Sequence, residues 1–294
     1  MPNNMQPNNM QPNDPEQLIL LTGGTGTTGR RIRSRLEARN IAVRTASRAG
    51  SPPFDWDSPE TWPAMLDGVT SVYIAYSPDL TVPGAVETVE RFCAEVRRTG
   101  VEKVVLLAGR GEKEAEAAED VVKASGARWA IIRASWFNQN FSEGMLLRAV
   151  LAGTIALPAG TVAEPFVDVE DIADVAVASL IDSAHDSRTY DVTGPRLMTF
   201  GEAAYELSVA SGRPVSFLHV TGNDFVVGAM ADGVPEPLAE VLAVMFEGIL
   251  DGRNAYLGQG VQEALGRPAQ DFATFAVRSA AEGAWSTPTN QDAV

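Results

Sequence analysis

The chain has 294 residues, of which 45% are hydrophobic and 21% are charged. These values are close to those of average globular proteins and exclude a fibrous repeat or a wholly disordered chain. The formal net charge of -15 would repel nucleic acid and anionic membrane surfaces, so neither is an expected partner. Cys93 stands alone and cannot form an internal disulfide, and no apolar stretch approaches the roughly 20 residues that span a bilayer.

Polar, proline-punctuated sequence opens the chain, and the first apolar run begins at Leu18. Residues 2–13 repeat Pro-Asn-Asn-Met-Gln and bury too little to offset their ordering entropy, so residues 1–16 are predicted to be a flexible tail. Because the tail lacks a basic segment followed by an apolar run, it does not resemble a signal peptide. We therefore expect a cytoplasmic protein.

Short apolar runs then alternate with segments of helical periodicity. The predicted strands are Leu18–Leu21, Ala42–Ala46, Ser71–Ala75, Val104–Leu107 and Trp129–Ile132, with a further short strand ending at Asp55-Trp56. Helices are predicted over Thr28–Arg39, Gly84–Arg98 and Glu112–Ser125. This alternation predicts an α/β fold with a Rossmann-like, doubly wound parallel sheet, whose NAD(P)-binding core is residues 17–140.

The second half has a less regular pattern. Residues 141–285 are expected to supply the remaining Rossmann elements and a smaller substrate-binding portion. They include a helix near Asp171–Ile181, a strand at Val215–Val220 and a helix-rich stretch over Pro235–Asp251. Residues 286–294 are expected to be a second flexible tail.

A glycine-rich turn joins the first strand to the first helix, at Gly23, Gly26 and Gly29. In this context, glycines permit a tight turn, close approach of the backbone to a diphosphate and close packing of helix on strand. Backbone N–H groups at the helix start would bind the phosphates. The predicted cofactor contacts in this turn are Thr22, Gly23, Thr25, Gly26, Thr27, Thr28 and Gly29.

Selection between the two pyridine nucleotides is expected at the end of the second strand. An NAD-selective site places a carboxylate there, whereas this chain has Ser47-Arg48, so NADP(H) is the predicted cofactor. A guanidinium binds a 2′-phosphate through paired, charge-assisted hydrogen bonds, and Arg30 is a second candidate. For both arginines, the alternative is a solvated surface charge. Asp55 and Trp56 are predicted to border the adenine, with core packing as the alternative for the indole.

The nicotinamide end of the cofactor is expected at the ends of the next two strands. Ala75, Tyr76 and Ser77 follow one of them, and Ala108 and Gly109 end the other.

Seven segments of this sequence together resemble the NmrA-like atypical short-chain dehydrogenases/reductases. Within them, the chain is most similar to the branch that contains the ergot alkaloid festuclavine and agroclavine dehydrogenases and their bacterial relatives. The segments occur in one order: the glycine turn, Ser47-Arg48, Phe54–Asp57, Leu107–Glu112, Arg133–Phe141, Pro165–Asp168 and Thr193–Pro195. The resemblance implies a reductase that delivers hydride from NADPH to an iminium or another conjugated electrophile, with a loop containing Asn138 beside the cofactor.

The Tyr-x-x-x-Lys couple of many short-chain reductases is missing from the helix that begins near Glu112. Ordinary carbonyl reduction is therefore disfavoured, while an iminium needs no proton in the hydride step and a quinone accepts hydride readily. If a proton is needed, the candidate catalytic residues are Tyr76, Glu112 and a water held by Arg110. The predicted substrate is a small molecule, flat or cationic, bounded by Tyr76, Arg110, Trp136, Phe137 and Asn138, although the two aromatic residues also suit a core.

Several polar residues have simpler interpretations. His185 and His219 have no neighbouring Cys or His set, so no metal site is predicted. Asp168 and Asp171 are expected to cap a helix, and Cys93 to be a packed thiol. The missing Tyr/Lys couple also leaves a second hypothesis, a non-catalytic NADP(H)-sensing regulator similar to NmrA. The oligomeric state is left open.

Overall fold

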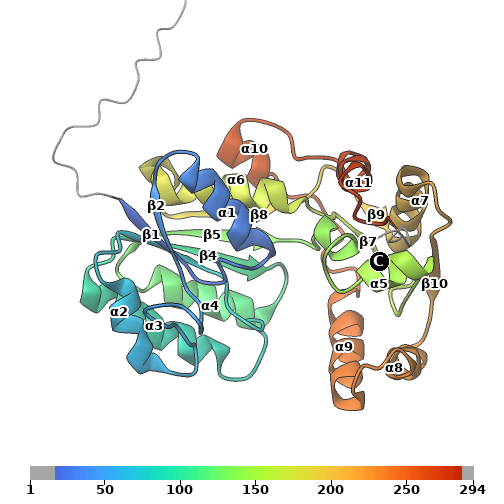
Figure 1. The fold of residues 1–294 in the computed structure, drawn as a ribbon, viewed down its shortest axis with the longest axis horizontal. Helices are drawn as coiled ribbons and strands as arrows, with labels where there is room; N and C mark the ends of the chain where they lie inside the picture. Colours follow the sequence, from blue (N-terminus) through green and yellow to red (C-terminus); the bar gives the residue numbers. More distant parts are fainter. Residues whose placement is uncertain (1–16, 287–294) are drawn as a thin grey trace, which may run out of the picture.

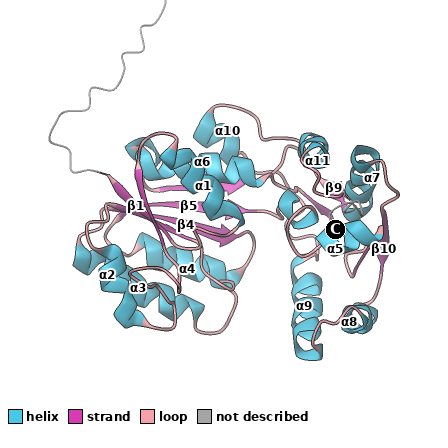
Figure 2. Cartoon of the chain, viewed as in Figure 1, coloured by secondary structure: helices cyan, strands magenta, loops and turns pink. Residues whose placement is uncertain are grey.

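A six-stranded, wholly parallel sheet forms the centre of the larger lobe (Figures 1 and 2). The computed structural model describes residues 17–286, so the predicted tail at 1–16 and residues 287–294 lie outside the described part. The strand order is β2-β1-β3-β4-β5-β8. The strands are β1 (Leu18–Leu21), β2 (Ala42–Thr45), β3 (Ser71–Ile74), β4 (Lys103–Gly109), β5 (Arg128–Ala134) and β8 (Arg188–Val192).

Helices cover both faces of this sheet because its strands are apolar on both sides. On β1, Ile19 and Leu21 pack toward one helical layer, whereas Leu20 packs toward the other. The first layer contains α1 (Thr27–Glu37), α6 (Val169–Ile181) and α10 (Gly260–Leu265). The second contains α2 (Trp62–Leu66), α3 (Ala85–Thr99) and α4 (Lys113–Lys123), with the short 3-10 turn η1 (Pro59–Thr61) before α2.

A smaller lobe lies beyond the carboxyl ends of the strands (Figure 1). Its own core gathers aromatic residues, among them Phe141, Phe166 and Phe200. Two short strand pairs belong to it: β6 (Thr154–Leu157) with β10 (Ser216–His219), and β7 (Ala163–Glu164) with β9 (Met198–Thr199). Its helical elements are η2 (Asn138–Phe141), α5 (Leu147–Ala152), α7 (Phe200–Ser211), α8 (Gly222–Ala231), α9 (Glu236–Ile249) and α11 (Phe272–Ala281). The turn η3 (Ser183–His185) instead joins α6 to β8.

The predicted doubly wound fold is confirmed, with one correction. All five principal predicted strands are present, but the short strand expected to end at Asp55-Trp56 is an irregular segment. The apolar pattern at Phe54 and Trp56 comes from a different cause: both side chains pack in an aromatic cluster with Trp62 and Phe92. An apolar pair in a loop and a short strand have the same local pattern.

Within residues 17–286, no helix combines the length and apolar character needed to cross a bilayer.

Candidate functional site

The turn after β1 leaves the amino end of α1 open. Gly26 is the N-cap residue and offers no side chain to accept a hydrogen bond from the first helical N–H groups. Thr25 and Gly26 are exposed, and the Gly26 N–H donates to the Gly23 carbonyl at 2.9 Å, which closes the turn. Uncapped N–H groups at a helix start are donors for an anion.

The glycines of the turn have different roles. A Cβ on Gly29 would lie 2.3 Å from the Gly23 carbonyl oxygen, so this position requires glycine for packing. Gly23 has a φ of +66°, in the left-handed region that favours glycine. At Gly26, a Cβ would meet only the Gly23 oxygen, at 3.2 Å. This contact is tight but is the only protein contact within 4 Å, so the turn leaves room for a diphosphate group.

Two threonines of the turn use their hydroxyl groups within the protein. Thr22 Oγ1 donates to the Tyr73 carbonyl at 3.1 Å and accepts from the Ala75 N–H at 2.9 Å. Thr28 Oγ1 accepts from the Tyr73 hydroxyl at 3.1 Å. Both side chains are buried. They fix the turn against β3, so only their backbone groups are available for the cofactor contact predicted from the sequence.

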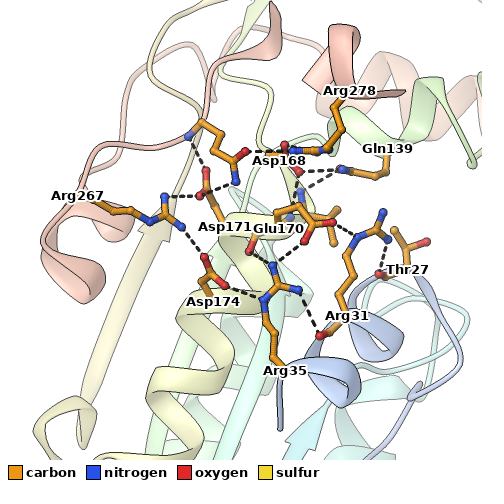
Figure 3. A network of polar contacts seen from close by, with 12 residues as sticks. Thr27, Arg31, Arg35, Gln139, Asp168, Glu170, Asp171, Asp174, Arg267 and Arg278 are labelled. Atoms are coloured by element: carbon orange, nitrogen blue, oxygen red, sulfur yellow. Dashed lines mark hydrogen bonds and ion pairs between the residues drawn. The ribbon is translucent and has the colours of Figure 1, made fainter. Parts of the chain in front are cut away.

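A network of ion pairs holds α1 in place (Figure 3). Arg31 Nε lies 2.5 Å from one Glu170 oxygen, and an Arg35 amino group lies 2.6 Å from the other. Burial by itself would raise the pKa of Glu170, but the hydrogen bonds from both arginines outweigh it and lower that pKa. Arg278 binds Asp168 at 2.7 Å in the same region, which ties α11 to α6.

Arg30 is neither a free solvated charge nor unpartnered, and its contact with a 2′-phosphate stays a prediction. Its guanidinium forms an ion pair with Glu143, from the segment between η2 and α5, and Arg31 binds the same carboxylate at 2.8 Å. No sequence motif singled out Glu143, and a 2′-phosphate bound by Arg30 would share the guanidinium with this carboxylate. The interaction joins residues 113 positions apart, so local pattern carried no signal for it.

Arg48 lies exposed in the turn after β2. The Phe54 N–H donates to the Ser47 carbonyl at 2.9 Å, which folds the segment back on itself. No hydrogen bond or ion pair to the Arg48 side chain occurs among residues 17–286. Its guanidinium is thus available at the strand end where it could bind the 2′-phosphate of NADP(H).

Trp56 is buried in the aromatic cluster with Phe54, whereas Asp55 is half-buried, and its contact with the adenine stays a prediction. The Asp55 carbonyl accepts from Trp62 Nε1 at 2.8 Å, and its carboxylate accepts from the Asp57 N–H at 3.1 Å. Trp56 is 8% exposed. Its ring lies 4.9 Å from that of Tyr76, tilted by 42°. The core alternative for Trp56 therefore holds, and Tyr76 is the half-buried member of the cluster next to the strand ends.

Glu112 folds back over the end of β4. A Cβ on Gly109 would lie 2.1 Å from a Glu112 carboxylate oxygen, so the absence of a side chain at Gly109 makes room for this carboxylate. Burial, together with the negative charges of Asp79 and Glu114, raises the pKa of Glu112 to about 7. Glu112 can therefore give or take a proton near neutral pH. Gly109 and Ala108 end the strand as predicted.

Arg110 is committed to packing. It is 3% exposed, and its guanidinium lies 3.5 Å from the centre of the Tyr256 ring. One amino group donates to the Asn254 carbonyl at 2.9 Å. Nε lies 2.7 Å from Asp191 Oδ1, a charge contact that lacks the alignment of a hydrogen bond. Arg110 thus ties β4 to the segment before α10, whereas the sequence suggested that it holds a water and borders the substrate.

Trp136, Phe137 and Asn138, in the segment after β5, have different surroundings. Trp136 stacks on Phe246 with ring centres 5.6 Å apart and planes 16° apart, and Phe137 pairs by its backbone with Val167. Asn138 is fully buried, and neither its Oδ1 nor its Nδ2 has a hydrogen-bond partner among residues 17–286. A buried amide without partners is costly unless a ligand or water satisfies it. This amide fits a polar ligand group near the strand ends.

The parallel sheet, the glycine turn and the open helix terminus define the class of Rossmann-fold nucleotide-binding oxidoreductases. No family model matches the chain. The (4-alkanoyl-5-oxo-2,5-dihydrofuran-3-yl)methyl phosphate reductase of Streptomyces griseus is 30% identical over 289 residues, which cover 90% of this chain and 98% of that protein. An agroclavine dehydrogenase of Claviceps purpurea is 27% identical over 291 residues, covering 91% and 98% of the two chains.

Among solved structures, the NADPH complex of the quinone oxidoreductase QOR2 from Escherichia coli has a TM-score of 0.75 at 20% identity. The match covers 88% of this chain and 99% of that one, and it shows the common fold. The chain belongs to the NmrA-like atypical short-chain dehydrogenase/reductase family. The resemblance inferred from the sequence and the expectation of an oxidoreductase are both confirmed.

Proposed function

We propose that the protein is an NADPH-dependent reductase of a small conjugated electrophile, such as a quinone or a cyclic iminium. The open amino end of α1 at Gly26 carries this proposal, because it presents unpaired N–H groups to a diphosphate at the carboxyl edge of the sheet. The relatives support it by their names, which include a reductase of a (dihydrofuranyl)methyl phosphate, an agroclavine dehydrogenase and an NADPH-bound quinone oxidoreductase.

NADP(H), rather than NAD(H), follows from the charge at the end of β2. Arg48 is exposed there and has the planar donor set that matches a phosphate. Asn138, with its unsatisfied amide, would orient the other end of the dinucleotide. The turn at Gly26 would hold the diphosphate between them.

When bound, NADPH supplies the hydride. Glu112 would hold a proton on a carboxyl oxygen at the end of β4, since its pKa is raised to about 7. A quinone that accepts hydride becomes an anion, and transfer of that proton to the anionic oxygen gives the hydroquinone. An iminium becomes a neutral amine on hydride transfer and takes no proton. The negative charges of Asp79 and Glu114 beside Glu112 would favour such a cation.

The proposal is tested by following NADPH absorbance with purified protein and two acceptors, menadione and N-methyl dihydroisoquinolinium. We expect acceptor-dependent oxidation of NADPH that exceeds the rate without acceptor, and slower oxidation of NADH. Tight NADPH binding by calorimetry, without turnover of either acceptor, would favour a non-catalytic sensor. Failure to bind either nucleotide would overturn the proposal.

A further inference from the structure

A cavity of about 500 Å³ lies within the smaller lobe, where α5, β6, α8 and α9 meet. Its lining includes none of the residues that the sequence assigned to cofactor or substrate. Small-molecule sites in proteins commonly have volumes of about 300–1,000 Å³ and mostly apolar walls. The cavity therefore has the size of a ligand site, separate from the turn at Gly26.

Small residues create this space. Ala149 and Ala152 on α5, and Gly228 and Ala229 on α8, line two of its walls. Side chains of this size cannot fill the gap between helices, as the larger residues of the lobe core do. Helix α8 contains no buried residue within its described range, so the cavity takes the place of the core on which α8 would otherwise pack.

Aliphatic residues and two aromatic ones form the rest of the apolar wall. Phe225 on α8 and Phe246 on α9 lie edge to face, with ring centres 5.2 Å apart. Phe246 also stacks on Trp136, two residues after the end of β5. Such rings offer flat apolar contact area to a bound molecule.

Charges of both signs occur at the cavity. Arg148 on α5 is exposed, and no ion pair to its side chain occurs among residues 17–286. Asp224 and Asp232, on the side of α8, are exposed as well, and Asp224 accepts from the Thr221 hydroxyl at 2.7 Å. Because positive and negative side chains both lie at the cavity, its charge favours neither an anionic nor a cationic ligand.

We infer that the cavity between α5 and α8 is a binding site for an uncharged, apolar small molecule. Binding removes from water the walls formed by alanine, leucine and phenylalanine side chains, which is the driving force for an uncharged ligand. The inference does not rest on NADPH binding, and each can hold without the other.

The test uses the uncharged fluorescent probe N-phenylnaphthylamine with the full chain. We expect saturable enhancement of its fluorescence at one site, and displacement by decanol more readily than by decanoate or decylamine. Ala229→Trp places an indole in the cavity and should weaken probe binding by roughly 10-fold or more, a change of about 1.4 kcal/mol. Val227→Trp is the matched control, because Val227 lies on the same helix and is 68% exposed.

Ala149→Phe fills the cavity from α5 and keeps the inference testable if Ala229→Trp does not fold, as judged by circular dichroism and thermal melting. The inference is overturned if a folded filling variant binds the probe as tightly as the parent. It is also overturned if Val227→Trp weakens binding equally, or if the parent shows no saturable binding.

Discussion

Arg48 provides the sharpest test of nucleotide selection at the level of one residue. Arg48→Ala should weaken NADPH binding much more than NADH binding, because only the phosphorylated adenosine loses a charged partner. A hydrogen bond to a charged group contributes about 1.5–3 kcal/mol, which corresponds to a loss of roughly 10- to 100-fold. Calorimetry with both nucleotides measures the effect.

Arg188→Ala is the matched control for that experiment. Arg188 is also exposed, but it opens β8 and so lies at the opposite edge of the sheet. The Arg188→Ala variant should bind NADPH and NADH with the affinities of the parent protein. Equal losses for NADPH and NADH in Arg48→Ala would remove Arg48 from the proposed site.

Glu112 should make quinone reduction depend on pH. Its pKa is raised to about 7, so the protonated fraction falls as the pH rises through that value. We expect kcat for menadione to fall over the same interval, and Glu112→Gln to lower kcat and abolish this dependence. Iminium reduction should lack the dependence in both proteins, because that acceptor needs no proton.

Glu116→Gln is the control for Glu112, since Glu116 is exposed on the same helix. It should keep the pH profile of the parent. A profile for menadione that Glu112→Gln leaves unchanged would assign the proton to another group, such as Tyr76 or water.

Single residues were only partly predictable from sequence. The position of Arg48 follows from its place after a strand, which the fold fixes. The ion pair of Arg30 does not, because Glu143 comes from a distant segment of the chain. Trp56 also had two interpretations, and the choice depended on neighbours such as Phe92, which only the folded chain brings to it.

At the scale of elements, two glycines of the turn after β1 are expected to have different roles: Gly26 serves nucleotide binding and Gly29 serves folding. Gly26 has φ and ψ of -76° and -177°, which other residues adopt, and a Cβ there meets only one protein atom at 3.2 Å. Gly26→Val should therefore fold, with a small loss of stability because the Gly23 carbonyl must shift slightly, and yet block the diphosphate. Gly29→Ala should instead lower the melting temperature, because its Cβ would lie 2.3 Å from a carbonyl oxygen. Thermal melting and NADPH calorimetry on both variants distinguish the two effects. Normal NADPH affinity in Gly26→Val would contradict the placement of the diphosphate.

Glu170 joins two turns of α1 to α6, as Figure 3 shows. Glu170→Gln should lower the free energy of unfolding by about 1.5–3 kcal/mol at neutral pH, because both arginines lose a charged acceptor. Since the pKa of Glu170 is lowered in the folded state, its contribution is present above its ordinary pKa and disappears as the pH falls through the folded value. Urea unfolding at neutral and acidic pH measures the difference.

An exposed ion pair within α1 is the control for Glu170. Glu37 lies 3.3 Å from Arg33, and both side chains are about half exposed. Glu37→Gln should change stability by no more than about 0.5 kcal/mol. If Glu170→Gln costs no more than Glu37→Gln, the network in Figure 3 does not stabilise the docking of α1.

For the whole molecule, the sequence predicted the sheet better than the smaller lobe. Buried parallel strands are continuous apolar runs, and their alternation with helices leaves few topologies. The smaller lobe instead depends on long-range pairs, such as Ser216 beside Thr154 in β10 and β6. Pairing of that kind has no local signature. The cavity beside α8 was equally hidden, because alanine and glycine fit a helix whether or not its neighbour is close.

Glu164 of β7 in the smaller lobe carries the last prediction. It is fully buried, and neither carboxyl oxygen has a hydrogen-bond partner among residues 17–286. Burial raises its pKa to about 7, although Arg110, at the end of β4, partly opposes this, and Asp251 adds to it. Because the folded-state pKa lies above the ordinary value, the stabilising effect of the protonated form is present in acid and is lost as the pH rises toward 7.

Glu164→Gln should consequently stabilise the protein only where the native carboxyl is ionised. At a pH of about 8 we expect the free energy of unfolding to rise by about 1–3 kcal/mol, since the buried charge is removed, and at a pH of about 5 we expect little change. Differential scanning calorimetry at both pH values measures this, with the exposed Glu240→Gln on α9 as control. An equal shift of the melting temperature at both pH values would mean that packing, rather than ionisation of Glu164, explains the effect.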